Sequence, residues 1–447
     1  MRRFILVATR VLAGVLVMGV VLWTWSRLQP PASGQRDAVA LLQPSPQPAG
    51  RNAFAALWLL GRDVPEARLQ RVAAADMQRI RGELAWSPDA APAGPGKGAA
   101  AQYRDLQLND ADRALFCSLH DDCLQQVRAD PDGHAALVAR HGVLLDRIEA
   151  LSGYDFYRSQ APFDPRAPIP MFSLAHLGIT HAAQAYASGD LDAGLARACT
   201  GVRTWRTLGA DADSLIVKML GVGLATDGHG RLLAQMLAEL PAGHPLPHAC
   251  EAALVPVSMD ELSICEAMRG EYASSAAALD AIDNPRFAGP LQAALNRLVY
   301  DPEKSRALTA GKFARACSNE VRAMLAADER WNWSQQPRSR WRMECVANLA
   351  GCILADIAAP AYAGYGQRAQ DGGARLDLLR GIASLHGVDG DASMREARLR
   401  RFWADTRSRN RELRFVDGGR AVEVRQFDVS QGDWWKLPLP GARQPRD

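Results

Sequence analysis

An apolar run near the start of the chain constrains its fold more than any other feature. From Phe4 to Trp25 almost every residue is apolar. As one helix, these about 22 residues would be roughly 33 Å long, enough to cross the hydrocarbon core of a bilayer. Trp23 and Trp25 fall where aromatic side chains gather at a membrane interface. The sequence therefore predicts a single transmembrane helix, since no later stretch approaches the clean apolar length that a second span needs.

The charges around this run predict its orientation. Arg2, Arg3 and Arg10 stand at its N-terminal side, and few charges follow it closely. The positive-inside rule then places the N-terminus in the cytoplasm and the bulk of the chain outside. Arginine far outnumbers lysine and alanine is abundant, which is typical of a GC-rich bacterial genome. We therefore expect a single-pass inner-membrane protein with a periplasmic body. The alternative is a cleaved signal peptide, with a passable small-residue site at Ala32–Gly34.

Composition and proline content divide the chain into four parts. Of 447 residues, 48% are hydrophobic and 23% are charged, which excludes a disordered, collagen-like or small disulfide-scaffold chain. The net charge of +3 gives no reason to expect nucleic acid as a partner. We expect a cytoplasmic tip and anchor over 1–28, a proline-rich stalk over 29–50, an all-α ectodomain over 51–385, and a basic helix with a β-hairpin over 386–447.

The ectodomain shows a series of segments with the 3.6-residue apolar period of helices. The clearest two cover residues 172–186 and 190–208, and Ser188-Gly189-Asp190 joins them, which predicts an antiparallel helical hairpin. This hairpin resembles a tetratricopeptide-type unit over about 34 residues, once, and the resemblance implies stacked hairpins as the architecture. The small and turn residues that carry the resemblance are Ala182, Gly189, Asp190, Gly194 and Gly201.

The apolar period changes after Arg411. Leu413–Val416 and Ala421–Arg425 have the composition of strands, and Asp417-Gly418-Gly419-Arg420 between them is typical of a turn. An isolated hairpin is only marginally stable, so we expect it to pack on the helical body. The predicted fold class is mostly α: a transmembrane helix, then a multi-helix ectodomain of stacked, tetratricopeptide-like hairpins with a small C-terminal β-hairpin.

Eight cysteines, all after the apolar run, favour disulfides in an oxidising compartment. Cys345 and Cys352 would lie on one expected helix, Arg340 to Ala358, about 10 Å apart along its axis and too far to bond. We therefore expect Cys352 to be free, and Cys199 to be a small buried apolar residue. The alternative is that all eight are reduced in a cytosolic domain. The expected bonds are Cys117–Cys123, Cys250–Cys265 and Cys317–Cys345.

One segment rich in tryptophan and arginine is the candidate binding surface. Aromatic and arginine side chains are enriched at binding surfaces and also stack on each other. The alternative is a loop between helices that folds its tryptophans onto the core. The candidate residues are Trp331, Trp333, Trp341, Arg338 and Arg340.

The sequence carries no recognisable signature of catalysis, a metal site or a cofactor. G-x-S-x-G, H-E-x-x-H and C-x2-C patterns are all missing. His244 and His248 are separated by a proline-rich stretch, so a structural loop is favoured over a metal site. Glu266 and Arg269 are expected to form an i,i+3 pair on a helix surface, with a catalytic Glu266 as the weaker interpretation.

Two functions are compatible with these features. The first is a non-catalytic helical binding or scaffold protein, tethered to the inner membrane, with a protein partner in the cell envelope. The second is a hydrolase acting on envelope material through an unrecognised carboxylate or histidine site. A pocket in which carboxylates converge with arginines would favour the hydrolase, whereas a broad groove without perturbed acids would favour the binding protein.

Overall fold

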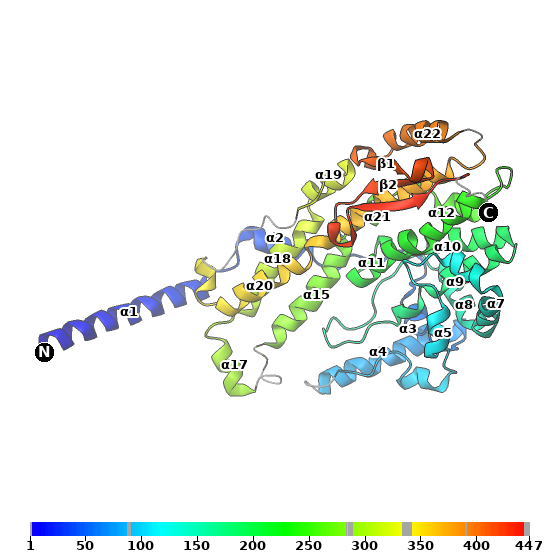
Figure 1. Cartoon of the computed structure of the whole chain (residues 1–447). Coiled ribbons are helices and arrows are strands. Elements are labelled where there is room, and N and C mark those ends of the chain that lie inside the picture. The colour runs from blue at the N-terminus through cyan, green and yellow to red at the C-terminus, as the bar shows by residue number, and fades with distance from the viewer. Residues whose placement is uncertain are drawn as a thin grey trace.

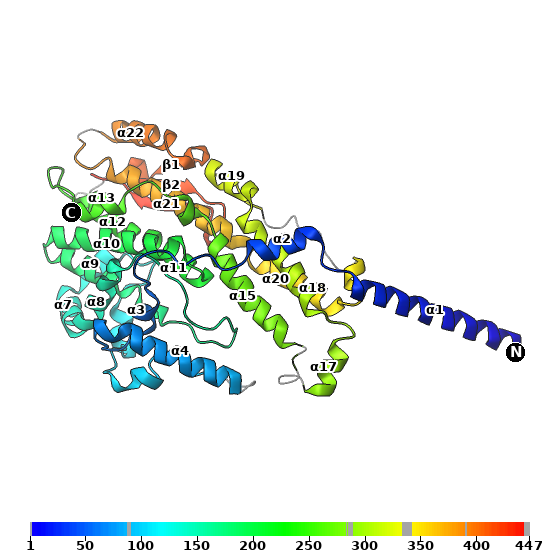
Figure 2. The same ribbon diagram turned by 180° about the vertical axis from the view of Figure 1, so that it is seen from behind.

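One long helix stands apart from a mostly helical body (Figures 1 and 2). The computed structural model describes residues 2–86, 91–282, 284, 289–332, 342–388 and 391–441. Within them, α1 (Arg2–Leu28) is the helix that is long and apolar enough to cross a membrane. The expected long apolar helix at the N-terminus is therefore confirmed.

Many short helices, rather than a few long ones, build the body. Its first half contains α2 (Ser33–Leu41), α3 (Phe54–Trp58), α4 (Leu69–Trp86), α5 (Asp110–Leu115), α6 (Cys123–Ala129), α7 (Pro131–Arg140), α8 (Gly142–Glu149), α9 (Leu177–Ala187), α10 (Leu191–Ala210), α11 (Leu215–Gly223) and α12 (His229–Glu239). Its second half contains α13 (His248–Ala253), α14 (Met259–Leu262), α15 (Cys265–Ala281), α17 (Pro290–Asn296), α18 (Pro302–Phe313), α19 (Asn319–Ala327), α20 (Leu349–Ala361), α21 (Ala363–Ala383) and α22 (Ala392–Ala404).

The predicted hairpin of two helices is present as α9 and α10. Asp190 begins α10, because its carboxylate accepts a hydrogen bond from the Ala193 N–H at 3.0 Å. Gly189 turns the chain with a φ of +98°, which favours glycine. Gly194 lies so close to Tyr186 that a Cβ would be 2.5 Å from that side chain. Small residues here thus serve close packing, and the stacking of further hairpins of this kind stays a prediction.

The C-terminal hairpin is confirmed, and a third strand extends it. Trp435 and Leu437 are buried while Lys436 between them is exposed, so one face of the last strand packs on the body. The backbone of the strand pairs with β2 at the edge of the hairpin. The antiparallel sheet has the order β1 (Leu413–Val416), β2 (Ala421–Arg425), β3 (Trp434–Pro438).

The end of α1 is built into the body. Ser26 is fully buried, and its hydroxyl accepts a hydrogen bond from the Ala347 N–H at 3.1 Å. Its carbonyl oxygen accepts a hydrogen bond from the ammonium group of Lys304, a buried lysine. Arg27 forms an ion pair with Asp301 at 3.3 Å. The last turn of α1 therefore supplies partners to buried polar groups of the body.

Four disulfides join consecutive cysteines along the chain. The expected Cys117–Cys123 bond is confirmed, with Cα atoms 5.5 Å apart. The other three bonds are Cys199–Cys250, Cys265–Cys317 and Cys345–Cys352. Together with the apolar helix, these four disulfides indicate an extracytoplasmic chain.

The expected bonds Cys250–Cys265 and Cys317–Cys345 are wrong, because both assumed that consecutive helices lie side by side at their cysteines. Cys250 bonds instead to Cys199, since α13 packs against α10, which comes much earlier in the chain. Cys265, at the start of α15, bonds to Cys317 in the short 3-10 helix Ala314–Cys317 that packs against α15. Cys199, expected to be unbonded, is therefore paired.

The Cys345–Cys352 bond corrects a further expectation about one helix. The two cysteines do not share a helix, because α20 begins only at Leu349 and Cys345 ends the separate 3-10 turn Met343–Cys345. The chain bends between the two elements, which brings the Cα atoms to 5.8 Å. Cys352, expected to be free, is bonded.

The disulfide set makes a prediction about stability. Replacing Cys199 and Cys250 together by Ala removes a bond between residues 51 positions apart. The unfolded chain then gains conformational freedom, which should lower the free energy of unfolding by about 4 kcal/mol. The same replacement of Cys117 and Cys123, with a separation of 6, should cost only about 2 kcal/mol. Urea unfolding of the full chain measures both values, and non-reducing peptide mapping checks the four bonds. Reduced cysteines in protein from the native host would contradict the extracytoplasmic location.

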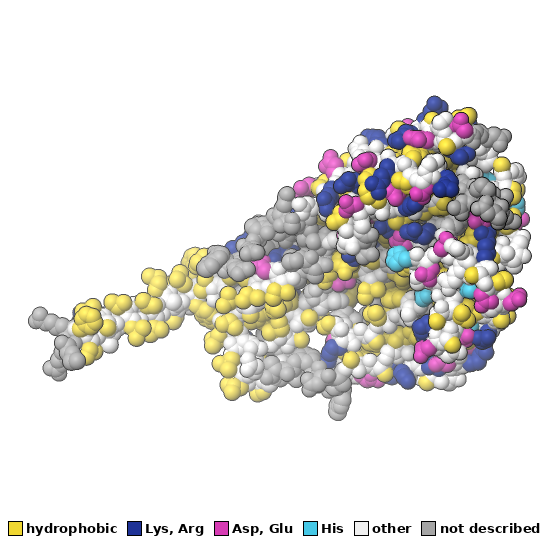
Figure 3. All heavy atoms as spheres, viewed as in Figure 1, with side chains coloured by type: hydrophobic (Ala, Val, Ile, Leu, Met, Phe, Trp, Pro, Cys, Tyr) yellow, Lys and Arg dark blue, Asp and Glu magenta, His cyan; other side chains and the backbone are white. Residues whose placement is uncertain are grey.

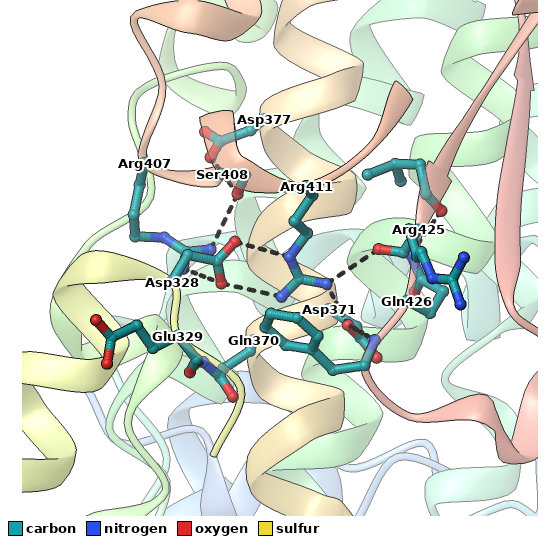
Figure 4. A network of polar contacts seen from close by, with 12 residues as sticks. Asp328, Glu329, Gln370, Asp371, Asp377, Arg407, Ser408, Arg411, Arg425 and Gln426 are labelled. Atoms are coloured by element: carbon teal, nitrogen blue, oxygen red, sulfur yellow. Dashed lines mark hydrogen bonds and ion pairs between the residues drawn. The ribbon is translucent and has the colours of Figure 1, made fainter. Parts of the chain in front are cut away.

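A buried ion network holds the C-terminal sheet to the helices (Figure 4). The guanidinium of Arg411 donates to both carboxylate oxygens of Asp328, at 2.7 and 3.0 Å, and also to Asp371 in α21. The side chains of all three residues are at most 2% exposed. Burial opposes the charge on Asp328, but the hydrogen bonds and charge of Arg411 outweigh it and lower the pKa of Asp328.

Replacing Arg411 by Met should lower the free energy of unfolding by roughly 3–5 kcal/mol, because buried Asp371 loses its counter-ion and Asp328 keeps only Arg407. Arg104→Met is the matched control. Arg104 pairs with Asp63 on the surface, where its side chain is 64% exposed, so the change should cost at most about 1 kcal/mol. Urea unfolding compares the two variants, and equal losses would show that the network contributes no more than a surface pair.

Candidate functional site

A groove of about 650 Å³ opens between residues 44–47, in the segment expected to form a stalk, and the helical body. One wall comes from stalk residues Pro44, Ser45 and Gln47, and another from α4. The segment 158–163 and the first turns of α15 complete it. Elements that are far apart in the sequence therefore meet around one cavity.

Asn52 fixes the segment that carries Arg158 into the groove. Its side chain donates to the Arg158 carbonyl at 2.8 Å and accepts from the Arg158 N–H at 3.0 Å. The next residue, Ser159, donates its N–H to both carboxylate oxygens of Asp213, at 2.8 and 3.0 Å. The side chains of Asn52 and Asp213 thus satisfy backbone hydrogen-bonding groups of a segment that has no regular secondary structure.

Charged groups converge at the base of the groove. Arg158 bridges Asp211, at 2.6 Å, and Glu266. Arg269 donates to the other oxygen of Glu266 at 2.7 Å, and the Ser45 hydroxyl donates to that oxygen at 2.7 Å as well. Burial opposes the charge on Glu266, but the hydrogen bonds and charges of these neighbours outweigh it and lower the pKa of Glu266.

The pKa of Asp213 is shifted in the opposite direction to that of Glu266. Burial raises its pKa to about 6, and the charge of Glu266 adds to this, against the hydrogen bond from Ser159 and the charge of Arg158. Glu271 lies five residues beyond Glu266 on α15, and burial raises its pKa too. The groove therefore combines Glu266, which stays ionised, with Asp213, which takes up a proton near pH 6.

Glu266 and Arg269 also line a second, smaller cavity of about 260 Å³. The Cys265–Cys317 disulfide forms part of its wall, and Asp211 and Arg322 line it as well. The pair therefore separates two cavities on either side of the start of α15.

The predicted Glu266–Arg269 pair forms with the expected spacing, but not on an open surface. The Glu266 side chain is only 12% exposed, because stalk residue Ser45 and Arg158 cover it. The i,i+3 contact could be predicted because it is local. No pattern in the sequence indicates that two distant segments pack over the pair.

The structure locates one of the predicted tryptophan and arginine residues. Trp331 is 2% exposed and packs against Gly366 of α21, while its backbone N–H donates to the side-chain oxygen of Gln370 at 3.2 Å. Its side chain is therefore part of the core, as the alternative interpretation expected. Trp333, Arg338, Arg340 and Trp341 lie outside the described residues, and their role stays a prediction.

Sequence reasoning missed Arg158, Asp213 and the stalk residues. Only a weak signal existed, namely that Arg158-Ser159-Gln160 is a polar stretch that follows the aromatic residues Phe156 and Tyr157. Asp213 stands just before a helix, where an acidic residue is ordinary. Neither residue type nor spacing reveals that the two segments meet.

Within the described residues, no three His, Cys, Asp or Glu side chains are arranged to hold a metal ion. His244 bonds Asp192 at 3.0 Å and His248 bonds Glu251 at 2.8 Å, so the two imidazoles are separately engaged. All eight cysteines are in disulfides, which leaves no thiolate as a ligand.

Comparison with known proteins identifies no relative: the chain matches no protein-family model, no curated protein and no solved structure. The chemistry of the groove therefore carries the functional argument.

The raised pKa of Asp213 predicts a specific pH dependence. Ionisation costs the folded chain more than the unfolded chain, so the wild type should lose stability as the pH rises from about 4 to above 6. Asp213→Asn cannot ionise and should lack this loss, which is about 3 kcal/mol for a pKa change from 3.8 to about 6. Urea unfolding at pH 4.5, inside this window, and at pH 7.5, above it, should show about 2 kcal/mol of this loss.

Asp37→Asn, at an exposed position of α2, is the control and should follow the wild type at both pH values. If Asp213→Asn shows the same pH dependence as Asp37→Asn, Asp213 does not titrate near pH 6.

Proposed function

We propose that the chain is an inner-membrane-anchored periplasmic binding protein whose ligand occupies the groove between the stalk and α15. The observation that carries this proposal is that the groove is large and open while the charges at its base are paired with one another. Arg158 and Arg269 are both engaged with Glu266. A site whose charges are already neutralised favours an uncharged ligand with polar and apolar parts over an ion.

The residues at the rim of the groove also favour an uncharged ligand with polar and apolar parts. Phe163 is 40% exposed there, and Pro44 and Pro162 add further apolar surface. Gln47 and Gln160 supply amide donors and acceptors beside them. An extended peptide segment of a cell-envelope partner combines these two kinds of surface, and the stalk would lie along it as one wall.

The anchor in this proposal rests on the end of α1. A signal peptidase acting near Ala32–Gly34 would remove Ser26 and Arg27 from the body. Lys304 would then lose its bond to the Ser26 carbonyl, and Asp301 would lose its ion pair with Arg27. Lys304 and Asp301 would keep only each other, at 3.8 Å, and buried charges with few partners are costly, so these contacts favour a helix that is retained.

A hydrolase is the second candidate, and Asp213 favours it. Carboxylates and arginines converge in the groove, and the pKa values of Asp213 and Glu266 move apart. Pairs of acids with opposite shifts are typical of general acid and base groups. In this case Asp213 would supply the proton, and the ligand would be a substrate.

A photo-crosslinker in the groove tests the binding proposal. Replacing Phe163 by benzoylphenylalanine in the native host should capture an envelope component, because the side chain is 40% exposed within the groove. The same probe at Val143 of α8, which is 43% exposed elsewhere, is the matched control. Adding Ala273→Trp, which fills the groove from α15, should reduce the Phe163 product at least about fivefold.

Equal capture at the two positions, or capture that Ala273→Trp leaves unchanged, would contradict the groove as the binding site. The captured ligand also separates the two candidates. A ligand recovered intact with both the wild type and Asp213→Asn supports binding alone, whereas a ligand cleaved only by the wild type supports the hydrolase.

A further inference from the structure

Two helices of the body expose apolar stripes to solvent. On α17 and the turn after it, Leu291, Leu295 and Leu298 recur at i, i+4 and i+7 and are 50–75% exposed. On α20, Leu349, Ile353 and Ile357 recur at i, i+4 and i+8 and are 46–67% exposed. Such spacing places each set on one helix face. We call these six residues the apolar shelf.

The two stripes lie beside each other. The N–H of Ala350, in the first turn of α20, donates to the carbonyl of Val299 at 3.0 Å. Figure 3 shows hydrophobic side chains gathered over α17 and α20, next to the base of α1, while charged side chains gather at the other end of the body. Exposed apolar patches of this kind mark a contact surface in a folded protein.

The shelf is continuous with the end of the apolar helix. The indole of Trp23 donates to the Leu298 carbonyl at 2.7 Å, so a shelf residue lies level with the aromatic end of α1. Tryptophan at that position marks the interface between hydrocarbon and headgroups. The body is held there by the buried contacts of Ser26 with Lys304 and Ala347.

The inner face of α20 has little apolar packing of its own. The core cluster beneath it consists of Leu308, Cys345, Cys352 and Ala355. The disulfide between the two cysteines closes this small cluster. The acidic residue of α20, Asp356, is only 16% exposed and is paired with Lys312 at 2.6 Å. No carboxylate of α20 therefore interrupts the shelf.

We propose that the apolar shelf lies in the outer headgroup and acyl boundary of the membrane that α1 crosses. Apolar helix faces at such a boundary bury about 5–10 Å into it. The body would then rest on the bilayer through α1, α17 and α20. This inference rests on the anchor in the proposed function, since without α1 in the bilayer nothing places the shelf at its surface.

Depth-dependent quenching on the full chain tests the shelf. Leu295→Cys and Ile357→Cys are each labelled with the dye NBD, and the protein is placed in nanodiscs of phosphatidylethanolamine and phosphatidylglycerol that contain nitroxide-labelled lipid. Val15→Cys in α1 reports on the anchor, and Val143→Cys on α8, 43% exposed, is the matched solvent control. We expect quenching at both shelf positions at least about threefold above that at Val143→Cys.

The quenching results distinguish a failure of the shelf from a failure of the anchor. Quenching at Val15→Cys without quenching at either shelf position overturns the shelf and leaves the anchor standing. Absence of quenching at Val15→Cys overturns the anchor and the shelf with it. Blue-shifted but unquenched dye at the shelf positions shows that protein, such as a second copy of the chain, covers the shelf instead of lipid. Non-reducing peptide mapping of each variant confirms that the added cysteine leaves the four disulfides in place.

Discussion

The desolvated guanidinium of Arg411 ties the last part of the chain to the rest. It lies between Asp328, which ends α19, and Asp371 in α21, and all three charges are shielded from water. Asp371 also accepts the N–H groups of Phe427 and Asp428, so the link between β2 and β3 is fixed by the same carboxylate. Since α21 packs against α11, α12 and α14, the network connects the sheet to the helical body.

Features encoded by neighbouring residues could be predicted from the sequence. The apolar length of α1, the α9–α10 hairpin with its Asp190 cap, and the β1–β2 hairpin all depend on short-range periodicity and turn residues. The Cys117–Cys123 bond belongs to the same class because the two cysteines are only six positions apart. The third strand depends instead on a distant contact, since Trp435 must find a place to pack on the body.

Features that depend on distant contacts could not be predicted. Whether Cys250 turns toward Cys199 or Cys265 is decided by the packing of α13 on α10, which no local pattern records. The groove could not be predicted either. Asn52 and Asp213 come from distant parts of the chain and hydrogen-bond the backbone of Arg158 and Ser159. Glu266 and Arg269 could be paired from spacing, yet their burial depends on Arg158 and the stalk.

The order of the disulfides has a consequence for export. Each cysteine bonds to the next one along the chain, first with second and so on, and no bond crosses or encloses another. A chain that leaves a translocation channel N-terminus first presents its thiols in this same order. An oxidase that joins each newly arrived thiol to the one waiting before it would thus produce the native set directly, without an isomerase to reshuffle it.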